Sequence, residues 1–133
     1  MTQIKSLNHV SIMVSDLEQA RRFYVDILGL QPAPRPDERL PTPGLWLRCG
    51  ESQVHLIVAE TVERPELTLE QRLREGVGLA PHFSLEVEDV VRAKEELAKR
   101  GVLILGGPVP RPDGARQLFC HDPDGNLLEL TSF

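Results

Sequence analysis

The sequence predicts an α+β fold made of two βαβββ modules, a prediction that rests on an internal repeat and on the hydrophobic patterning of each copy. Residues 7–17 and residues 81–90 share residue types at an offset of 73 positions. The matched pairs are His9 with His82, Ser11 with Ser84, Val14 with Val87, and Asp16 with Asp89. Each copy begins with alternating apolar and polar residues and continues with an apolar stripe at helical spacing. The chain therefore contains one structural motif twice.

Each copy predicts a strand followed by an amphipathic helix. Asp16 in the first copy and Asp89 in the second precede the apolar stripe. A carboxylate at this position accepts hydrogen bonds from the free N–H groups of the first helical turn. Gly29 and Gly101 follow the stripes and end the helices, because glycine readily adopts the backbone conformation of a helix C-terminus.

A short strand, a proline-rich loop and a hairpin follow each predicted helix. The first hairpin consists of strands at 45–49 and 53–59, and the second of strands at 116–121 and 126–131. The second turn reads Asp-Pro-Asp-Gly, in which proline sets φ for the turn and glycine accepts a positive φ. Superposing the two return strands aligns His55 with Glu129.

The length of 133 residues fits a single domain. We expect module 1 at about 4–60, a linker at about 60–80 and module 2 at about 81–133. A short helix is expected in the linker at Leu69 to Arg74.

Composition excludes several classes of protein. A hydrophobic content of 41% argues against disorder, and a net charge of −5 argues against a nucleic-acid-binding surface. No apolar run is long enough for a membrane span, and the N-terminal residues do not resemble a signal peptide. We therefore expect a cytoplasmic protein without membrane or nucleic-acid partners. Two cysteines do not predict a disulfide scaffold.

Three histidines and one glutamate are expected on a common polar face. Strand alternation puts His9, His55, His82 and Glu129 on the face opposite the one that packs under the helices. The repeat relates His9 to His82 and His55 to Glu129. Imidazole and carboxylate groups together suit a divalent transition metal such as Zn, Ni, Fe or Mn. Two histidines with one glutamate also match the facial triad of non-haem Fe(II) oxygenases.

A structural interpretation of the same residues stays open, because a histidine in a strand is commonly a partly buried polar residue. His121, beside the second hairpin turn, is interpreted as structural. Cys49 and Cys120 are interpreted as small apolar residues of the core.

The chain resembles the vicinal oxygen chelate superfamily, which includes glyoxalase I, methylmalonyl-CoA epimerase, bleomycin-resistance proteins, fosfomycin thiol transferases and extradiol dioxygenases. The resemblance covers essentially the whole chain. It rests on five stretches of sequence. Three lie in the first module, namely Leu7-Asn8-His9-Val10, residues 16–30 with Phe23-Tyr24-Val25-Asp26-Ile27-Leu28-Gly29, and Gln53-Val54-His55-Leu56. Two lie in the second module, namely residues 81–87 and Asp122-Pro123-Asp124-Gly125-Asn126 with the strand up to Leu130.

The resemblance implies that the curved, mixed sheets of the two modules form a cup around a metal, with the helices on the outer face. It implies a ligand at each position matching His9, His55, His82 and Glu129. Family members vary most at the position of His55, which is therefore a fourth ligand or a base beside the metal. We expect His55 and Glu129 to be catalytic residues.

The expected function is that of a metal-dependent, glyoxalase-like lyase or isomerase that acts on a small oxygenated substrate bound to the metal. The alternatives are a single-domain Fe(II) extradiol-type dioxygenase and a non-catalytic drug-binding protein. The resemblance also implies a homodimer, with the site within one chain or across two. Met13 and Ala59 stand at positions where glyoxalase I binds glutathione, which argues against glyoxalase I itself. The loops Pro32 to Pro43 and Pro108 to Gly114 are expected to shape the substrate pocket, but they show no recognisable substrate code.

Overall fold

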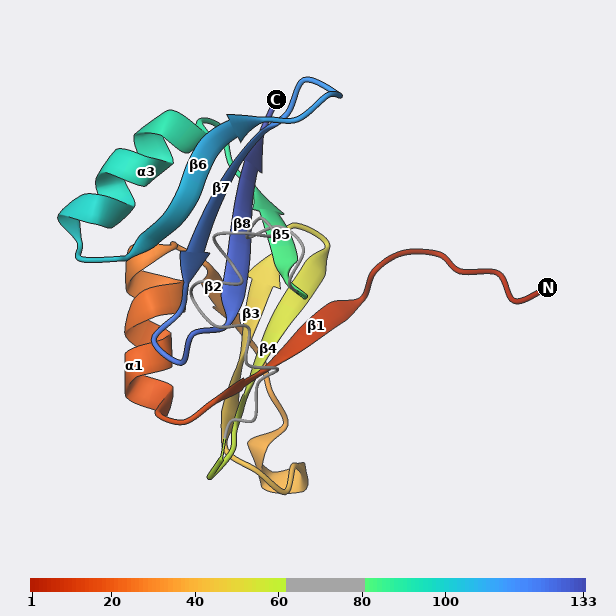
Figure 1. Cartoon of the computed structure of the whole chain (residues 1–133). Helices are drawn as coiled ribbons and strands as arrows, with labels where there is room; N and C mark the ends of the chain where they lie inside the picture. Colours follow the sequence, from red (N-terminus) through yellow and green to blue (C-terminus); the bar gives the residue numbers. More distant parts are fainter. Residues whose placement is uncertain (62–80) are drawn as a thin grey trace. The chain divides into compact units, whose positions relative to one another are not determined.

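The computed structural model describes residues 1–61 and 81–133 (Figure 1). The chain divides into two compact units, Met1–Val62 and Glu63–Phe133, whose described parts are called the N-terminal and C-terminal modules below. The helix expected at 69–74 lies outside the described residues. In the described ranges, no helix has the length and apolar character needed to cross a membrane.

The N-terminal module follows the predicted order of elements. Its elements are β1 (His9–Val14), α1 (Leu17–Arg21), a π-helix (Arg22–Ile27), β2 (Gln31–Ala33), a 3-10 turn (Asp37–Arg39), β3 (Gly44–Cys49) and β4 (Ser52–Val58). The sheet has the order β1-β4-β3-β2, in which β1 and β4 are parallel and the other pairs are antiparallel.

The C-terminal module repeats this topology. Its elements are β5 (Phe83–Glu86), α3 (Val90–Lys99), β6 (Ile104–Pro110), β7 (Arg116–His121) and β8 (Leu127–Ser132). The sheet order β5-β8-β7-β6 again contains one parallel pair, β5 with β8. The predicted α+β fold of two βαβββ modules is confirmed.

The helices begin and end where the sequence predicts. Asp16 Oδ1 accepts a hydrogen bond from the backbone N–H of Gln19 at 3.0 Å, and Asp89 Oδ1 accepts one from that of Val91 at 2.8 Å. Gly29 and Gly101 both have φ of +80°, a conformation that favours glycine. The first helix differs from the expectation in one respect, since its second half is a π-helix rather than an α-helix.

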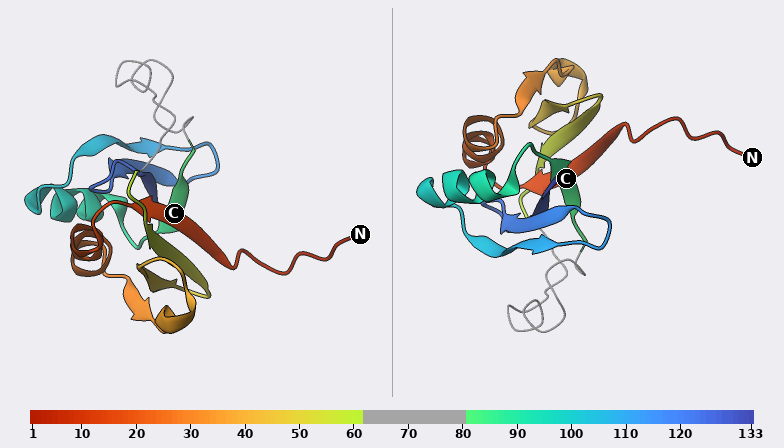
Figure 2. Two further views of the ribbon diagram at one scale, coloured as in Figure 1. Left: turned by 90° about the horizontal axis from the view of Figure 1, so that it is seen from below. Right: turned by 90° about the horizontal axis from the view of Figure 1, so that it is seen from above.

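One face of each sheet forms the core. In the N-terminal module α1 packs against β3 and β4, and in the C-terminal module α3 packs against β6, β7 and β8 (Figure 2). The core side chains of these sheets and helices are almost fully buried, namely Val14, Ala20, Leu47, Val54 and Leu56 in the first module and Val90, Leu97, Leu118, Leu128 and Leu130 in the second. The opposite face of each sheet carries the polar residues singled out above.

Strand register shows the repeat at the level of individual residues. Ser11 lies opposite His55 in the β1–β4 pair, and Ser84 lies opposite Glu129 in the β5–β8 pair. On the other side of the return strands, Trp46 of β3 pairs with His55, as Phe119 of β7 pairs with Glu129. His55 and Glu129 thus occupy equivalent places in the two sheets.

Candidate metal centre

The N-terminal module brings His9 and His55 together in a stack of three rings. The His9 and His55 ring centroids are 4.1 Å apart with planes inclined by 17°. Trp46 lies on the other side of His55, with centroids 4.3 Å apart and planes only 6° from parallel. His55 is therefore held between Trp46 and His9.

Hydrogen bonds fix the tautomers of both rings. His55 Nε2 donates to Gln53 Oε1 at 2.7 Å, and His9 Nδ1 donates to Asn8 Oδ1 at 2.7 Å. Because an amide oxygen only accepts, the lone pair of His55 lies on Nδ1 and that of His9 on Nε2. These are the atoms through which the two rings can bind a metal.

His55 is the buried member of this pair, with only 9% of its surface exposed. Burial lowers the pKa of His55, and the charges of His9 and Arg35 lower it further. The neutral imidazole that results is the form that binds metals or accepts a proton.

The stacked arrangement also has a geometric consequence for metal binding. A metal lies close to the plane of each imidazole that binds it, and the planes of two stacked rings inclined by only 17° do not meet near the rings. One of the two rings must therefore turn before both can bind one ion. His9 is the ring that can turn, because it is exposed whereas His55 is enclosed.

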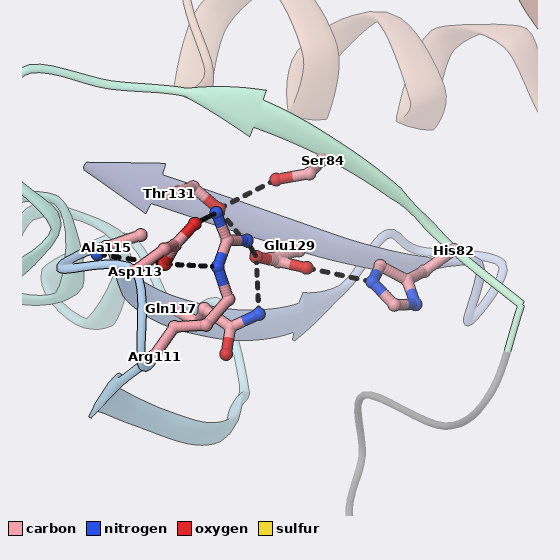
Figure 3. Close-up of polar contacts among 8 residues, drawn as sticks. All are labelled: His82, Ser84, Arg111, Asp113, Ala115, Gln117, Glu129 and Thr131. Carbon is pink, nitrogen blue, oxygen red and sulfur yellow. Dashed lines mark hydrogen bonds and ion pairs between the residues drawn. The ribbon is translucent and has the colours of Figure 1, made fainter. Parts of the chain in front are cut away.

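The C-terminal module brings His82 and Glu129 into direct contact (Figure 3). His82 Nε2 donates to Glu129 Oε2 at 2.8 Å. The edge of the His82 ring meets Phe119, with centroids 5.6 Å apart. The Glu129 side chain is almost fully buried and that of His82 is 19% exposed.

Two further donors hold the second carboxylate oxygen of Glu129. Oε1 accepts hydrogen bonds from Gln117 Nε2 at 2.9 Å and from Thr131 Oγ1 at 2.6 Å. Burial alone would raise the pKa of Glu129, but the hydrogen bonds from Thr131, Gln117 and His82 together lower it. Glu129 is consequently an ionised carboxylate whose Oε2 is directed towards His82.

An arginine lies beside this carboxylate. Arg111 donates to Asp113 through Nε at 2.7 Å and through Nη2 at 2.6 Å, and its Nη1 is 3.9 Å from Glu129 Oε1. The hydrogen bond from Arg111 lowers the pKa of Asp113 to about 2. Arg111 is thus held in place by a fixed negative charge.

The chemistry of these side chains fits a divalent metal. Adjacent ligand atoms of a divalent metal are about 3.0 Å apart in an octahedral site and about 3.4 Å apart in a tetrahedral one, so His82 Nε2 and Glu129 Oε2, now 2.8 Å apart, need only a small shift to share an ion. A metal ion can therefore replace the proton that joins them. Taken within either module, the described residues contain no group of three or more His, Cys, Asp or Glu that could hold a metal. Each module supplies two of the four predicted ligands.

The structure thus brings His9 to His55 and His82 to Glu129, and the meeting of the two pairs stays a prediction. The cysteines are both free. Cys120 is fully buried, and burial followed by the charge of Asp122 raises its pKa to about 11, which makes this thiol unreactive.

Sequence reasoning missed three residues that shape the two pairs, Trp46, Gln117 and Thr131. The signal for Thr131 was available, because strand alternation puts it on the same face as Glu129. Trp46 and Gln117 required the register of the neighbouring strands, which pairs Trp46 with His55 and Gln117 with Thr131.

Comparisons with known proteins agree with the fold. The family model of the "Glyoxalase/Bleomycin resistance protein/Dioxygenase superfamily" matches residues 6–130. A protein named Glyoxylase I 4 from Arabidopsis thaliana is 30% identical, and the match covers 96% of this chain and 70% of that protein. An ethylmalonyl-CoA/methylmalonyl-CoA epimerase from Cereibacter sphaeroides is 31% identical, with 96% of this chain and 97% of the epimerase covered.

Solved structures share the fold. A glyoxalase family crystal structure from Bacillus anthracis has a TM-score of 0.78 and 25% identity, and the match covers 99% of this chain and 98% of that chain. A fosfomycin resistance protein from Listeria monocytogenes has a TM-score of 0.73 at 16% identity, with 98% and 95% covered, and is similar in fold alone.

Proposed function

Because this chain belongs to the glyoxalase/bleomycin resistance protein/dioxygenase superfamily, we propose that it is a metal-dependent enzyme, a lyase or isomerase that acts on a small oxygenated substrate. The observation that carries this proposal is the contact between His82 and Glu129. These two residues occupy the same places in the C-terminal sheet as His9 and His55 in the N-terminal sheet. The glyoxylase and epimerase names among the relatives favour a lyase or isomerase over an oxygenase.

In this proposal His9, His82 and Glu129 are ligands, and His55 is either a fourth ligand or a base beside the metal, because its one free lone pair on Nδ1 cannot serve both roles. The ion is zinc, nickel, iron or manganese, which accept imidazole and carboxylate together. When bound, the metal supplies Lewis-acid stabilisation of negative charge on the substrate oxygens.

The residues of the chain supply proton transfer and a fixed geometry. His55 is neutral and has its lone pair on Nδ1, so it can accept a proton from a bound substrate. Trp46 shields one face of the His55 ring from water. Gln117 and Thr131 hold Oε1 of Glu129, so Oε2 is the oxygen left for the ion.

We further propose a homodimer in which both modules contribute to each site. A pair of side chains leaves most positions around a metal open, so each pair needs a second one. The resemblance favours a site in which His9 and His55 meet His82 and Glu129 of the partner subunit.

The direct test is metal analysis of protein purified without an affinity tag, followed by assays of the protein reconstituted with each metal in turn. We expect bound metal, together with isomerisation of a hemithioacetal or epimerisation of an acyl-CoA thioester. Catechol cleavage with iron would instead support the oxygenase. Protein without metal that also fails to bind any of these ions would contradict the proposal. His121→Gln is a matched control, since it removes a histidine outside both pairs.

A further inference from the structure

A four-residue sequence occurs twice in the loops that were expected to shape the substrate pocket. Pro34-Arg35-Pro36-Asp37 follows β2, and Pro110-Arg111-Pro112-Asp113 begins at the last residue of β6. The two copies therefore occupy corresponding places in the two modules. They place one arginine in each module.

Each arginine binds the aspartate two positions further along its own loop. Arg35 Nη1 donates to Asp37 Oδ1, and Arg111 donates to both oxygens of Asp113. The aspartates are the exposed partners, with 72% of the Asp37 side chain and 52% of the Asp113 side chain accessible. Both guanidinium groups are thus fixed in orientation by a carboxylate that itself faces solvent.

Arg35 lies on the same face of its sheet as His55. A Cβ atom added to Gly44 would lie too close to the backbone oxygen of Leu56 and 3.2 Å from Arg35 Nη2, so the guanidinium lies directly against Gly44. Gly44 shares its face of β3 with Trp46, which stacks on His55. The charge of Arg35 is also close enough to lower the pKa of His55.

Arg35 retains an unused donor in this position. Its side chain is only 8% exposed, and Nη2 donates to the backbone oxygen of Thr42 at 2.6 Å. Nε is buried and has no hydrogen-bond partner among the described residues. A buried N–H without an acceptor is costly, so an oxygen from a ligand would stabilise it.

Arg111 directs a guanidinium nitrogen towards Glu129, with which it forms an ion pair rather than a hydrogen bond. Asp113 occupies Nε and Nη2, whereas Nη1 is 3.9 Å from Glu129 Oε1, too far for a hydrogen bond (Figure 3). The Arg111 side chain is 36% exposed, so a molecule in solution can reach it.

We propose that Arg35 and Arg111 are substrate-binding residues that select an acid, one that carries a carboxylate in addition to the oxygens held at the metal. Guanidinium groups match carboxylates in shape and charge, and both arginines already hold one. Each lies beside, and is not part of, the predicted ligand pair of its module. The inference rests on the proposed metal-dependent function.

The test compares malate with lactate, because both are 2-hydroxy acids and only malate has a second carboxylate. Both are titrated calorimetrically into zinc-loaded protein. We expect malate to bind at least about tenfold more tightly, the effect of one charge-assisted hydrogen bond. Arg111→Gln and Arg35→Gln should each remove most of this difference when the titrations are made on zinc-saturated protein, while the affinity for lactate changes little. Arg39→Gln and Arg92→Gln, both on exposed surface, should bind like the wild type.

Arg35 also supports its loop, so circular dichroism must show that its variants fold. If Arg35→Gln does not fold, Arg35→Lys replaces it in the titration, because lysine keeps the charge without the guanidinium shape. Arg111→Gln tests the preference for malate independently of Arg35. Equal affinities for malate and lactate in the wild type, or a preference for malate that survives in both variants, would overturn the proposal.

Titration of metal-free protein separates this inference from the proposed function. A wild-type protein that binds no divalent metal contradicts the proposed function. An arginine-dependent preference for malate in that metal-free protein would still support the carboxylate site, and its absence would overturn the site as well.

Discussion

Glu129 is positioned by three donors from different parts of the C-terminal sheet. Gln117 donates from β7, Thr131 from the same strand as Glu129, and His82 from the residue before β5. A carboxylate in such a setting keeps one oxygen fixed and presents the other. The hydroxyl of Thr131 makes the shortest of these contacts, at 2.6 Å.

Thr131→Val should therefore weaken zinc binding about 10- to 100-fold, because it removes this donor while it preserves the shape of the side chain. A competition titration against a chelator measures the affinity. Thr131→Ser keeps the hydroxyl and should bind zinc nearly as well as the wild type. Equal zinc affinity in Thr131→Val and the wild type would show that the hydroxyl does not position Glu129.

The lowered pKa of His55 predicts a pH dependence of stability. Burial holds the pKa of His55 in the folded protein below the ordinary histidine value of about 6.5, so the unfolded state binds more protons between the two pKa values. The free energy of unfolding should fall as the pH decreases from about 7 to about 5, and this contribution is fully present above the unfolded pKa.

Urea unfolding of metal-free protein over this range measures the effect, with His55→Gln as the comparison. The variant lacks a titrating imidazole and should lose less stability on acidification than the wild type. If the free energy of unfolding decreased equally with pH in both proteins, His55 would not be the group responsible for the pH dependence.

At the residue scale, alternation along the strands predicts that His9, His55, His82 and Glu129 avoid the core face. It does not predict how their rings lie, because the orientation of His55 depends on Trp46 from another strand. The loops that contain Arg35 and Arg111 can be recognised in the sequence as proline-rich segments. The position of the Arg35 guanidinium against Gly44 is seen only in the structure.

At the scale of elements, local sequence signals were sufficient to predict where most helices and strands begin and end. The acidic N-cap residues and the glycines at the helix ends correctly predicted where both helices begin and end. The return strand predicted at 126–131 is observed at Leu127–Ser132. The π-helical half of the first helix was not predicted, since the apolar stripe fits an α-helix. It contains Phe23 and Tyr24, neighbours in sequence that are both buried.

The turn around Asp122 joins β7 to β8, the strand that carries Glu129. Asp122 is 4% exposed, and its Oδ1 accepts hydrogen bonds from the backbone N–H of Asp124 at 2.9 Å and of Asn126 at 2.8 Å. Asp122→Ala should lower the free energy of unfolding by about 1 to 2 kcal/mol, because two partly buried backbone donors lose a charged acceptor. Chemical denaturation measures this, and Asp122→Asn, which keeps one acceptor oxygen, should lose less. A change below about 0.5 kcal/mol in Asp122→Ala would show that the backbone alone holds the turn.

At the scale of the whole molecule, the repeat predicted the topology of the two modules. It relates His9 to His82 and His55 to Glu129. The repeat does not specify whether a metal site combines the two modules of one chain or modules of two subunits. That choice depends on the path of the chain between the modules and on the subunit interface.

Subunit mixing tests the proposed cross-subunit site. His9→Ala and Glu129→Ala proteins should each bind zinc weakly. After exchange, about half of the dimers are mixed and each has one intact site, so about a quarter of the tight sites should return. Absence of recovery, when labelled subunits demonstrably exchange, would mean that each site is built within one chain.

The most direct test of the central claim is a zinc titration of the wild type beside His82→Ala and His55→Ala. We predict one tight zinc ion per chain in the wild type, a severe loss of affinity in His82→Ala and a smaller loss in His55→Ala, where water can take the fourth position. Zinc affinity that is the same in all three proteins, or a wild type that binds none, would contradict the account of these residues as a metal centre.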